Sequence, residues 1–143
     1  MTATLEVAPP AAAITGPRLR SAVSLPAAIR EFSGLQLRDY GGAGGLKTIN
    51  VRSLGSAHTA IFLDGVPIDN AQNAQVDLGR ISTEGLERVE LFQGQRSQTL
   101  QTAREYGSAS SLHLTSALPS PEGRNGFRVR LRGGSMEIGR AHV

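Results

Sequence analysis

Apolar and polar side chains alternate along several short stretches of the chain, which is the pattern of half-buried β-strands. Strands are predicted for residues 35–40, 48–52, 59–63, 87–92 and 111–115. The stretch 59–63 is more uniformly apolar than the others. In 87–92, charged residues alternate with apolar ones, so we expect Val89 and Leu91 to point inward.

One turn is predicted from the residues between two of the apolar runs. Asp64 and Gly65 separate residues 59–63 from residues 66–68. Asp-Gly tolerates positive φ at both positions, which is the type I′ signal of a two-residue β-hairpin. Pro67 cannot donate a hydrogen bond to a neighbouring strand, so the return strand should be short or at a sheet edge.

Helices are expected to be few and short. Ser24 is a good N-cap, Pro26 fits the first turn that follows, and Gly34 is placed to end the helix. Residues 77–82 are expected to form one helical turn, and residues 95–105 are compatible with helix or loop. The pattern predicts an α+β domain with a small mixed sheet and short helices.

Composition makes the predicted core thin. Aromatic residues are 4% of the chain, there is no Trp, and Gly reaches 17. Because large apolar side chains contribute most of the energy of a core, such a domain is marginal alone or leans on a partner surface. The absence of Cys excludes disulfides, a thiolate nucleophile and Cys-based zinc sites.

The motifs do not suggest an enzyme, and no cofactor or metal site is expected. The chain has no nucleophile-elbow motif of the Gly-x-Ser-x-Gly type, no P-loop and no dinucleotide-binding glycine motif. It also has no His-Glu-x-x-His motif of zinc proteases. Four residues that could suggest a catalytic triad are interpreted instead as turn and surface groups: Ser53, Ser56, His58 and Asp64. The net charge of +3 is a mild excess spread along the chain, so nucleic acid is not an expected partner.

Several segments, taken in order, resemble the plug domain of TonB-dependent outer-membrane receptors. The segments that carry the resemblance are residues 25–29, Asn50-Val51-Arg52 with 53–55, the hairpin 62–68, Leu86-Glu87-Arg88-Val89-Glu90, and Tyr106-Gly107-Ser108 through Thr115. Residues 41–73 look especially like receptors of Bacteroidetes-type bacteria. The chain departs from the family pattern at Ser53, at residues 93–95 and at residues 110–111.

The resemblance implies a set of plug-motif residues: Arg52, Asp64, Gly65, Glu87, Arg88 and Glu90. The three charged residues of 87–90 have two interpretations. They form a solvated strand face with weak ion pairs, or they pack on a charged barrel wall near Arg52.

Residues 1–22 are rich in Ala, Pro and Thr and are expected to form an extended tail before a plug domain at 23–116. Leu5, Glu6 and Val7 are similar to a TonB-box, which would add a strand to the energy transducer TonB. The alternative is a plain linker.

The C-terminal part is expected to hold three segments. Residues 117–126 read as a linker, and 127–136 as the start of a β-barrel, since Phe127, Val129 and Leu131 alternate with arginines. An edge strand of a soluble sheet would show the same alternation. Residues 137–143 resemble a translated sequencing adapter, so they are expected to be non-native.

Taken together, the expected function is that of a gating plug in a bacterial outer-membrane importer, cut off from its signal peptide and barrel. The resemblance implies TonB, the receptor's own barrel and a small-molecule substrate as partners, the substrate being a ferric siderophore, cobalamin or a glycan. Residues 41–46 and 69–75 are candidate substrate-facing loops. The alternative hypothesis is a free-standing soluble α+β binding module, with a basic nucleic-acid binder as a third.

Overall fold

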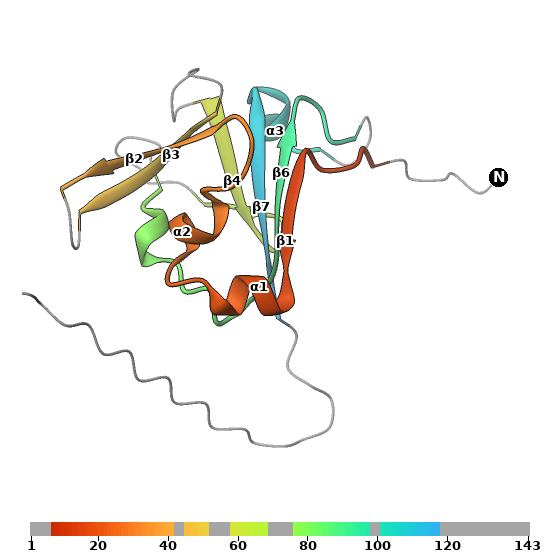
Figure 1. The fold of residues 1–143 in the computed structure, drawn as a ribbon. Coiled ribbons are helices and arrows are strands. Elements are labelled where there is room, and N and C mark those ends of the chain that lie inside the picture. Colours follow the sequence, from red (N-terminus) through yellow and green to blue (C-terminus); the bar gives the residue numbers. More distant parts are fainter. Residues whose placement is uncertain (1–6, 42–44, 52–57, 69–75, 98–100, 118–143) are drawn as a thin grey trace, which may run out of the picture.

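The computed structural model describes residues 7–41, 45–51, 58–68, 76–97 and 101–117 (Figure 1). In chain order these residues form β1 (Ala12–Thr15), α1 (Gly16–Ser21), α2 (Leu25–Ile29), β2 (Leu35–Tyr40), β3 (Leu46–Val51), β4 (Thr59–Leu63), β5 (Val66–Pro67), the 3₁₀ turn η2 (Leu78–Arg80), β6 (Leu86–Gln93), α3 (Ala103–Tyr106) and β7 (Ser110–Ser116). The predicted α+β class, with short helices around a mixed sheet, is confirmed.

The main sheet has five strands in the order β1-β6-β7-β4-β5. Strands β4 and β7 are parallel, whereas the other neighbours are antiparallel, so the sheet is mixed. Strands β2 and β3 form a separate antiparallel hairpin, which projects to one side of the main sheet (Figure 1). The long crossover that a parallel pair requires is supplied by the chain between β4 and β7.

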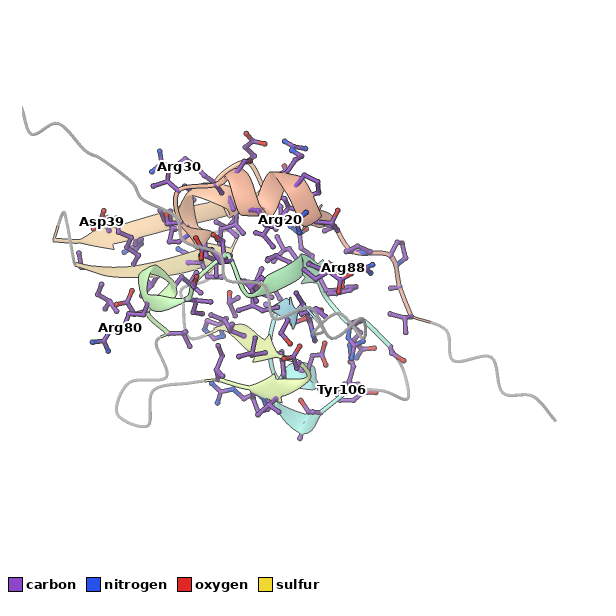
Figure 2. The ribbon with its side chains drawn as sticks, turned by 90° about the horizontal axis from the view of Figure 1, so that it is seen from below. Arg20, Arg30, Asp39, Arg80, Arg88 and Tyr106 are labelled. Atoms are coloured by element: carbon purple, nitrogen blue, oxygen red, sulfur yellow. The ribbon has the colours of Figure 1, made fainter. Side chains whose placement is uncertain are left out.

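The apolar core lies on the face of the sheet that α1 and α2 cover. Leu19 of α1 and Ile29 of α2 are fully buried in the same cluster as Val89, Leu91 and Leu112 of the sheet. Figure 2 shows Arg20 and Arg30 of the helical region on one side of the sheet, with Tyr106 of α3 on the other. The prediction that Val89 and Leu91 point inward is therefore confirmed.

The prediction that residues 1–22 form an extended tail is wrong for residues 12–21. Strand β1 pairs with β6 along its whole length, with Ile14 opposite Val89, and Leu19 of α1 is fully buried. The Ala-rich sequence suggested mobility, but small side chains also suit an edge strand under a helix. Pro17 fits the first turn of α1, where its missing N–H costs nothing.

The helix prediction is right at its start and wrong at its end. The Ser24 hydroxyl accepts a hydrogen bond from the Ala27 N–H at 3.3 Å, and Pro26 lies in the first turn. The helix ends at Ile29, whereas Gly34 lies beyond it with φ at +79° and leads into β2. A glycine at the entry of a strand serves the same need for positive φ as one at a helix end.

The other segment predictions differ from the structure at their boundaries. The turn predicted at 77–82 is the shorter η2, capped by Asp77, whose carboxylate accepts from the Gly79 N–H at 3.0 Å. Of the described residues of 95–105, those from Ala103 onward are helical, in α3. The segments predicted at 117–126, 127–136 and 137–143 lie outside the described residues except for Ala117.

Candidate functional site

The Asp64-Gly65 turn has the predicted geometry. Asp64 has φ of +50° and Gly65 has φ of +81°, and Leu63 pairs with Val66 on either side of the turn. Positive φ at both central residues is the signature of a type I′ turn, whose twist matches that of the flanking strands. The hairpin prediction is confirmed.

Asp64 has a second role that the turn signal does not reveal. Its carboxylate accepts hydrogen bonds from the Ser116 N–H at 2.8 Å and the Ser116 hydroxyl at 2.7 Å. The Asp64 N–H also donates to the Leu114 carbonyl at 2.9 Å. The two bonds from Ser116 hold the pKa of Asp64 below its usual value, because both stabilise the ionised carboxylate. The turn is thereby fastened to the end of β7.

The sheet face opposite the helices carries an aromatic stack. Because side chains alternate along a strand, Phe92 lies on the other face from Leu91. The His113 ring of β7 stacks on Phe62 of β4 at 4.8 Å with an interplanar angle of 9°, and Phe92 meets it edge-on at 5.3 Å. The guanidinium of Arg96 lies 5.8 Å from the centre of the Phe92 ring. This face is therefore aromatic and charged, unlike the apolar face.

Beside the aromatic stack lies a buried carboxylate. Glu105 of α3 is only 4% exposed. Its Oε1 atom accepts from Arg96 Nε at 3.1 Å and from the Ser111 hydroxyl at 3.2 Å, and it lies 2.9 Å from His113 Nε2. Thr102 positions the short helix by accepting from the Glu105 N–H at 3.3 Å. A buried charge needs such compensation, because desolvation penalises it strongly.

The surroundings of His113 in this cluster favour its neutral form. Burial lowers its pKa most, while the hydrogen bond to Glu105 and the charge of that carboxylate oppose the shift; Arg96 adds to the lowering and Glu90 opposes it. The net effect is that the pKa of His113 is lowered. A carboxylate can only accept, so the proton of the neutral ring belongs on Nε2, from which it is donated to Glu105. The cluster of Arg96, Glu105, Ser111 and His113 is called the polar cluster below.

The model of the TonB-dependent Receptor Plug Domain family matches residues 6–110. This includes β1, α1, the hairpin with its Asp64 turn and β6. The chain belongs to this family.

Curated relatives of this plug are similar over about half of the chain. It is 30% identical to the vitamin B12 transporter BtuB of Vibrio vulnificus over 69 residues, which is 48% of the chain and 11% of that protein. It is 33% identical to BtuB of Photobacterium profundum over 76 residues, which is 53% of the chain and 12% of that protein. The chain thus spans about a ninth of the length of the relatives it matches.

Solved receptor structures share the fold of the plug. The siderophore receptor PirA from Acinetobacter baumannii superposes with a TM-score of 0.56 at 19% identity, covering 75% of this chain and 17% of that one. The copper transporter OprC superposes with a TM-score of 0.54 at 15% identity, covering 73% and 16%. At such identities the likeness establishes the fold alone. No helix in the described ranges is long and apolar enough to cross a bilayer.

Of the predicted plug-motif residues, the described ones lie in the Asp64-Gly65 turn and on β6. Glu87 and Arg88 are exposed on β6, and Arg88 Nη1 lies 3.5 Å from Glu90 Oε1. Arg52 lies outside the described residues, as do Leu5 and Glu6, whereas Val7 forms an isolated bridge with Ser97. Of the four residues considered for a triad, Ser53 and Ser56 also lie outside, and Asp64 is bonded to Ser116.

Nothing in the sequence pattern predicted the polar cluster of the plug. Its members come from three separate segments, and no spacing in the sequence links Arg96 or Glu105 to His113. One available signal was His113 itself, a titratable residue within the predicted strand 111–115. Among the described residues, no group of three or more His, Asp or Glu side chains has the geometry of a metal site.

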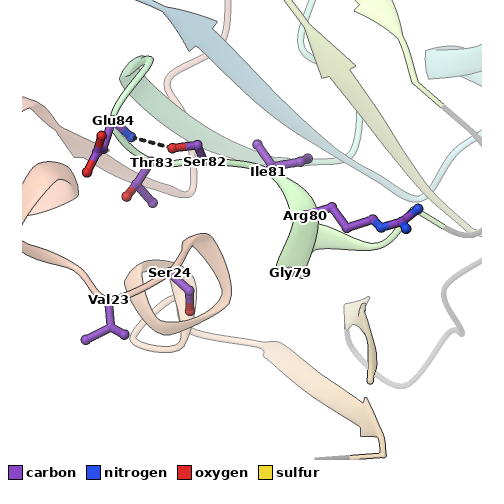
Figure 3. A pocket seen from close by; sticks show the side chains of 8 residues that line it. All are labelled: Val23, Ser24, Gly79, Arg80, Ile81, Ser82, Thr83 and Glu84. Carbon is purple, nitrogen blue, oxygen red and sulfur yellow. Dashed lines mark hydrogen bonds between the residues drawn. The ribbon is translucent and has the colours of Figure 1, made fainter. Parts of the chain in front are cut away.

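A pocket of about 370 Å³ lies elsewhere in the plug, between the start of α2 and the segment from η2 to β6. Its lining includes Val23, Ser24, Ser82, Thr83 and Glu84, and the Glu84 N–H donates to the Ser82 hydroxyl at 3.3 Å. Figure 3 shows the Arg80 side chain extending away from Ser24 and Val23. The polar cluster brings a buried carboxylate, a guanidinium and an imidazole within hydrogen-bond distance of one another, so it is the better candidate for function.

Proposed function

We propose that this plug closes the barrel of a bacterial outer-membrane receptor that imports a scarce nutrient with energy delivered by TonB. The match of the plug family over residues 6–110 carries the proposal. The BtuB relatives transport vitamin B12, and PirA is a siderophore receptor. The proposed substrate is therefore a small molecule such as cobalamin or a ferric siderophore, with a glycan as a further candidate.

The composition and surface of the domain agree with a role against a barrel wall. A core this poor in aromatic residues gains stability from an enclosing surface. Glu87 and Arg88 are exposed on β6, the strand that pairs with β1, and we propose that they face the receptor's own barrel. Ion pairs between the plug and the barrel would be partly desolvated, so each pair would contribute more binding energy than an ion pair in water.

The N-terminal end of the described chain is the proposed contact with TonB. Val7 is 42% exposed although it bridges to Ser97, so it is accessible to a partner strand. An extended segment that adds a strand to a partner sheet gains main-chain hydrogen bonds without a preformed pocket. Leu5, Glu6 and Val7 are proposed to act in this way.

A plug deletion in the bacterium that makes the protein tests the proposal. Removing the codons for residues 7–117 should open the barrel, because large barrels enclose an aqueous channel. Cells should then admit a large hydrophilic antibiotic and lose TonB-dependent uptake of radiolabelled cobalamin or ferric siderophore. A strain lacking the whole gene is the control and should lose uptake without becoming permeable. Unchanged permeability with the shortened protein present in the outer membrane would contradict the proposal.

A further inference from the structure

The N-terminal segment is attached directly to the residue that neutralises the buried carboxylate. Val7 bridges Ser97, and the Ala8 N–H donates to the Arg96 carbonyl at 2.7 Å. The Ala11 N–H donates to the Leu91 carbonyl at 2.8 Å, so the segment then continues along β6 into β1. The end of the chain that a transducer would reach first is therefore also the end that holds Arg96.

Arg96 is bound at both ends. Its backbone carbonyl accepts from Ala8, while its side chain reaches Glu105 at 3.1 Å and lies over Phe92. The Arg96 side chain is 23% exposed, whereas that of Glu105 is 2% exposed. A shift of the Arg96 backbone therefore changes the ion pair with Glu105, and water cannot replace Arg96 there because the carboxylate is buried.

We propose that Arg96 couples the N-terminal segment to the polar cluster, so that detaching Val7 and Ala8 withdraws Arg96 from Glu105 and lets His113 bind a proton in its place. The pulling by TonB rests on the proposed function, but the coupling is a property of the chain itself. The proton comes from water and binds the free ring nitrogen of His113. The cluster then exchanges an Arg–Glu pair for a His–Glu pair and keeps the buried carboxylate neutralised.

The charges around His113 set the direction of the effect. Glu105 faces it from α3, Glu90 lies opposite it on β6, and Arg96 approaches from the segment after β6. Strand β4 contributes the uncharged Phe62. Of these groups only Arg96 is positive, so its withdrawal must raise the pKa of His113. By reciprocity, protonation of His113 must favour detachment of the segment.

Proline substitution tests the coupling on the full chain. Ala8→Pro removes the N–H that donates to Arg96, in a segment where Pro9 already favours extended backbone. We expect the His113 imidazole, followed by NMR, to titrate about half a pH unit higher than in the parent chain. Ala11→Pro is the matched control, because it removes an equivalent hydrogen bond to Leu91 instead. It should leave the His113 titration unchanged.

A second substitution shows whether the coupling runs through the carboxylate. In a Glu105→Gln background, Ala8→Pro should lose most of its effect on His113, because the carboxylate no longer holds the Arg96 guanidinium beside the ring in either chain. An unchanged His113 titration in Ala8→Pro would overturn the proposal. So would an equal shift in Ala11→Pro, or a full shift in the Glu105→Gln background.

The two proposals fail in different ways. The titration uses the isolated chain and needs no barrel, TonB or substrate. If uptake and permeability contradict the receptor function, a shift confined to Ala8→Pro still establishes the coupling. If the plug deletion behaves as expected but His113 titrates identically in all variants, the coupling is wrong and the receptor function stands.

Discussion

The two faces of the five-stranded sheet are built on different principles. The face under α1 and α2 is filled by aliphatic side chains, among them Val89, Leu91 and Leu112, which are fully buried. The opposite face places a carboxylate, a guanidinium and an imidazole among two aromatic rings. The first face is stabilised by apolar packing, whereas the second face is stabilised by the balance of its buried charges. We therefore expect only the second face to respond to pH and to the attachment of the N-terminal segment.

The largest effect should come from the apolar face. Leu112→Ala removes a fully buried side chain from the central strand β7 and should cost about 3 kcal/mol of unfolding free energy. Urea unfolding followed by far-UV circular dichroism measures this change. Val66→Ala is the control, because Val66 is 61% exposed. A Leu112→Ala loss as small as that of Val66→Ala would mean that the face is not a specifically packed core.

The next effect should come from the polar cluster. Arg96→Gln leaves Glu105 without its cation in a nearly dry site, so we expect a loss of about 2 kcal/mol near neutral pH. The loss should shrink in acid, where His113 takes up a proton and supplies a positive charge beside the carboxylate. Arg88→Gln is the matched control, because the Arg88 side chain is 52% exposed and its pair with Glu90 contributes little. Equal losses in the two variants would remove the distinction between the faces.

The sequence predicted the apolar face much better than the polar one. Alternation along 87–92 placed Val89 and Leu91 inward because a strand fixes side-chain direction residue by residue. The Asp64-Gly65 turn was also predictable, because its positive φ is a local requirement. The role of Asp64 at Ser116 was not, because the two residues lie 52 positions apart.

Distance along the chain also explains the other failures. The polar cluster joins Arg96, Glu105 and His113 only after β6 and β7 have paired. Strand β1 was missed because its alanines carry no periodic signal, and its pairing with β6 becomes visible only in the folded chain. The turns and the strand faces were thus predictable from neighbouring residues. The candidate site was not, because it depends on pairing between strands that are distant in the sequence.

A smaller effect should appear in the pH dependence of stability. The pKa of folded His113 lies below the ordinary value of 6.5, so as pH falls through that value the unfolded chain binds the proton first. This residue's contribution is therefore complete above pH 6.5 and declines below it until the folded pKa is reached. His113→Phe, which keeps a ring to stack on Phe62, should remove that part of the slope. Thermal unfolding between about pH 5 and pH 8 measures it. An identical slope in the parent chain and in His113→Phe would show that the cluster does not sense protons.

The smallest effect should come from the Asp64 turn, which lies outside both faces. The lowered pKa of Asp64 means that its ionised form is favoured by folding, so its contribution is present above 3.8 and is lost as pH falls through the folded value. Asp64→Asn tolerates the positive φ of 50° but loses the charge that strengthens both bonds from Ser116. The variant should melt slightly below the parent chain at about pH 7, and the gap should close as the pH falls below 3.8 and through the folded pKa of Asp64.

The Asp64→Gly variant distinguishes the contribution of the turn's backbone to stability from that of the Asp64 carboxylate. Glycine adopts the required φ freely, and its greater freedom in the unfolded chain costs the same at every pH, so the part of the loss that disappears in acid reports the missing bonds to Ser116. If both variants melt with the parent chain at every pH, Asp64 is only a turn residue, and the end of β7 is held by its strand neighbours alone. If the gap is as large in acid as at neutral pH, the loss comes from the backbone of the turn, and the charge on Asp64 contributes nothing to fastening it.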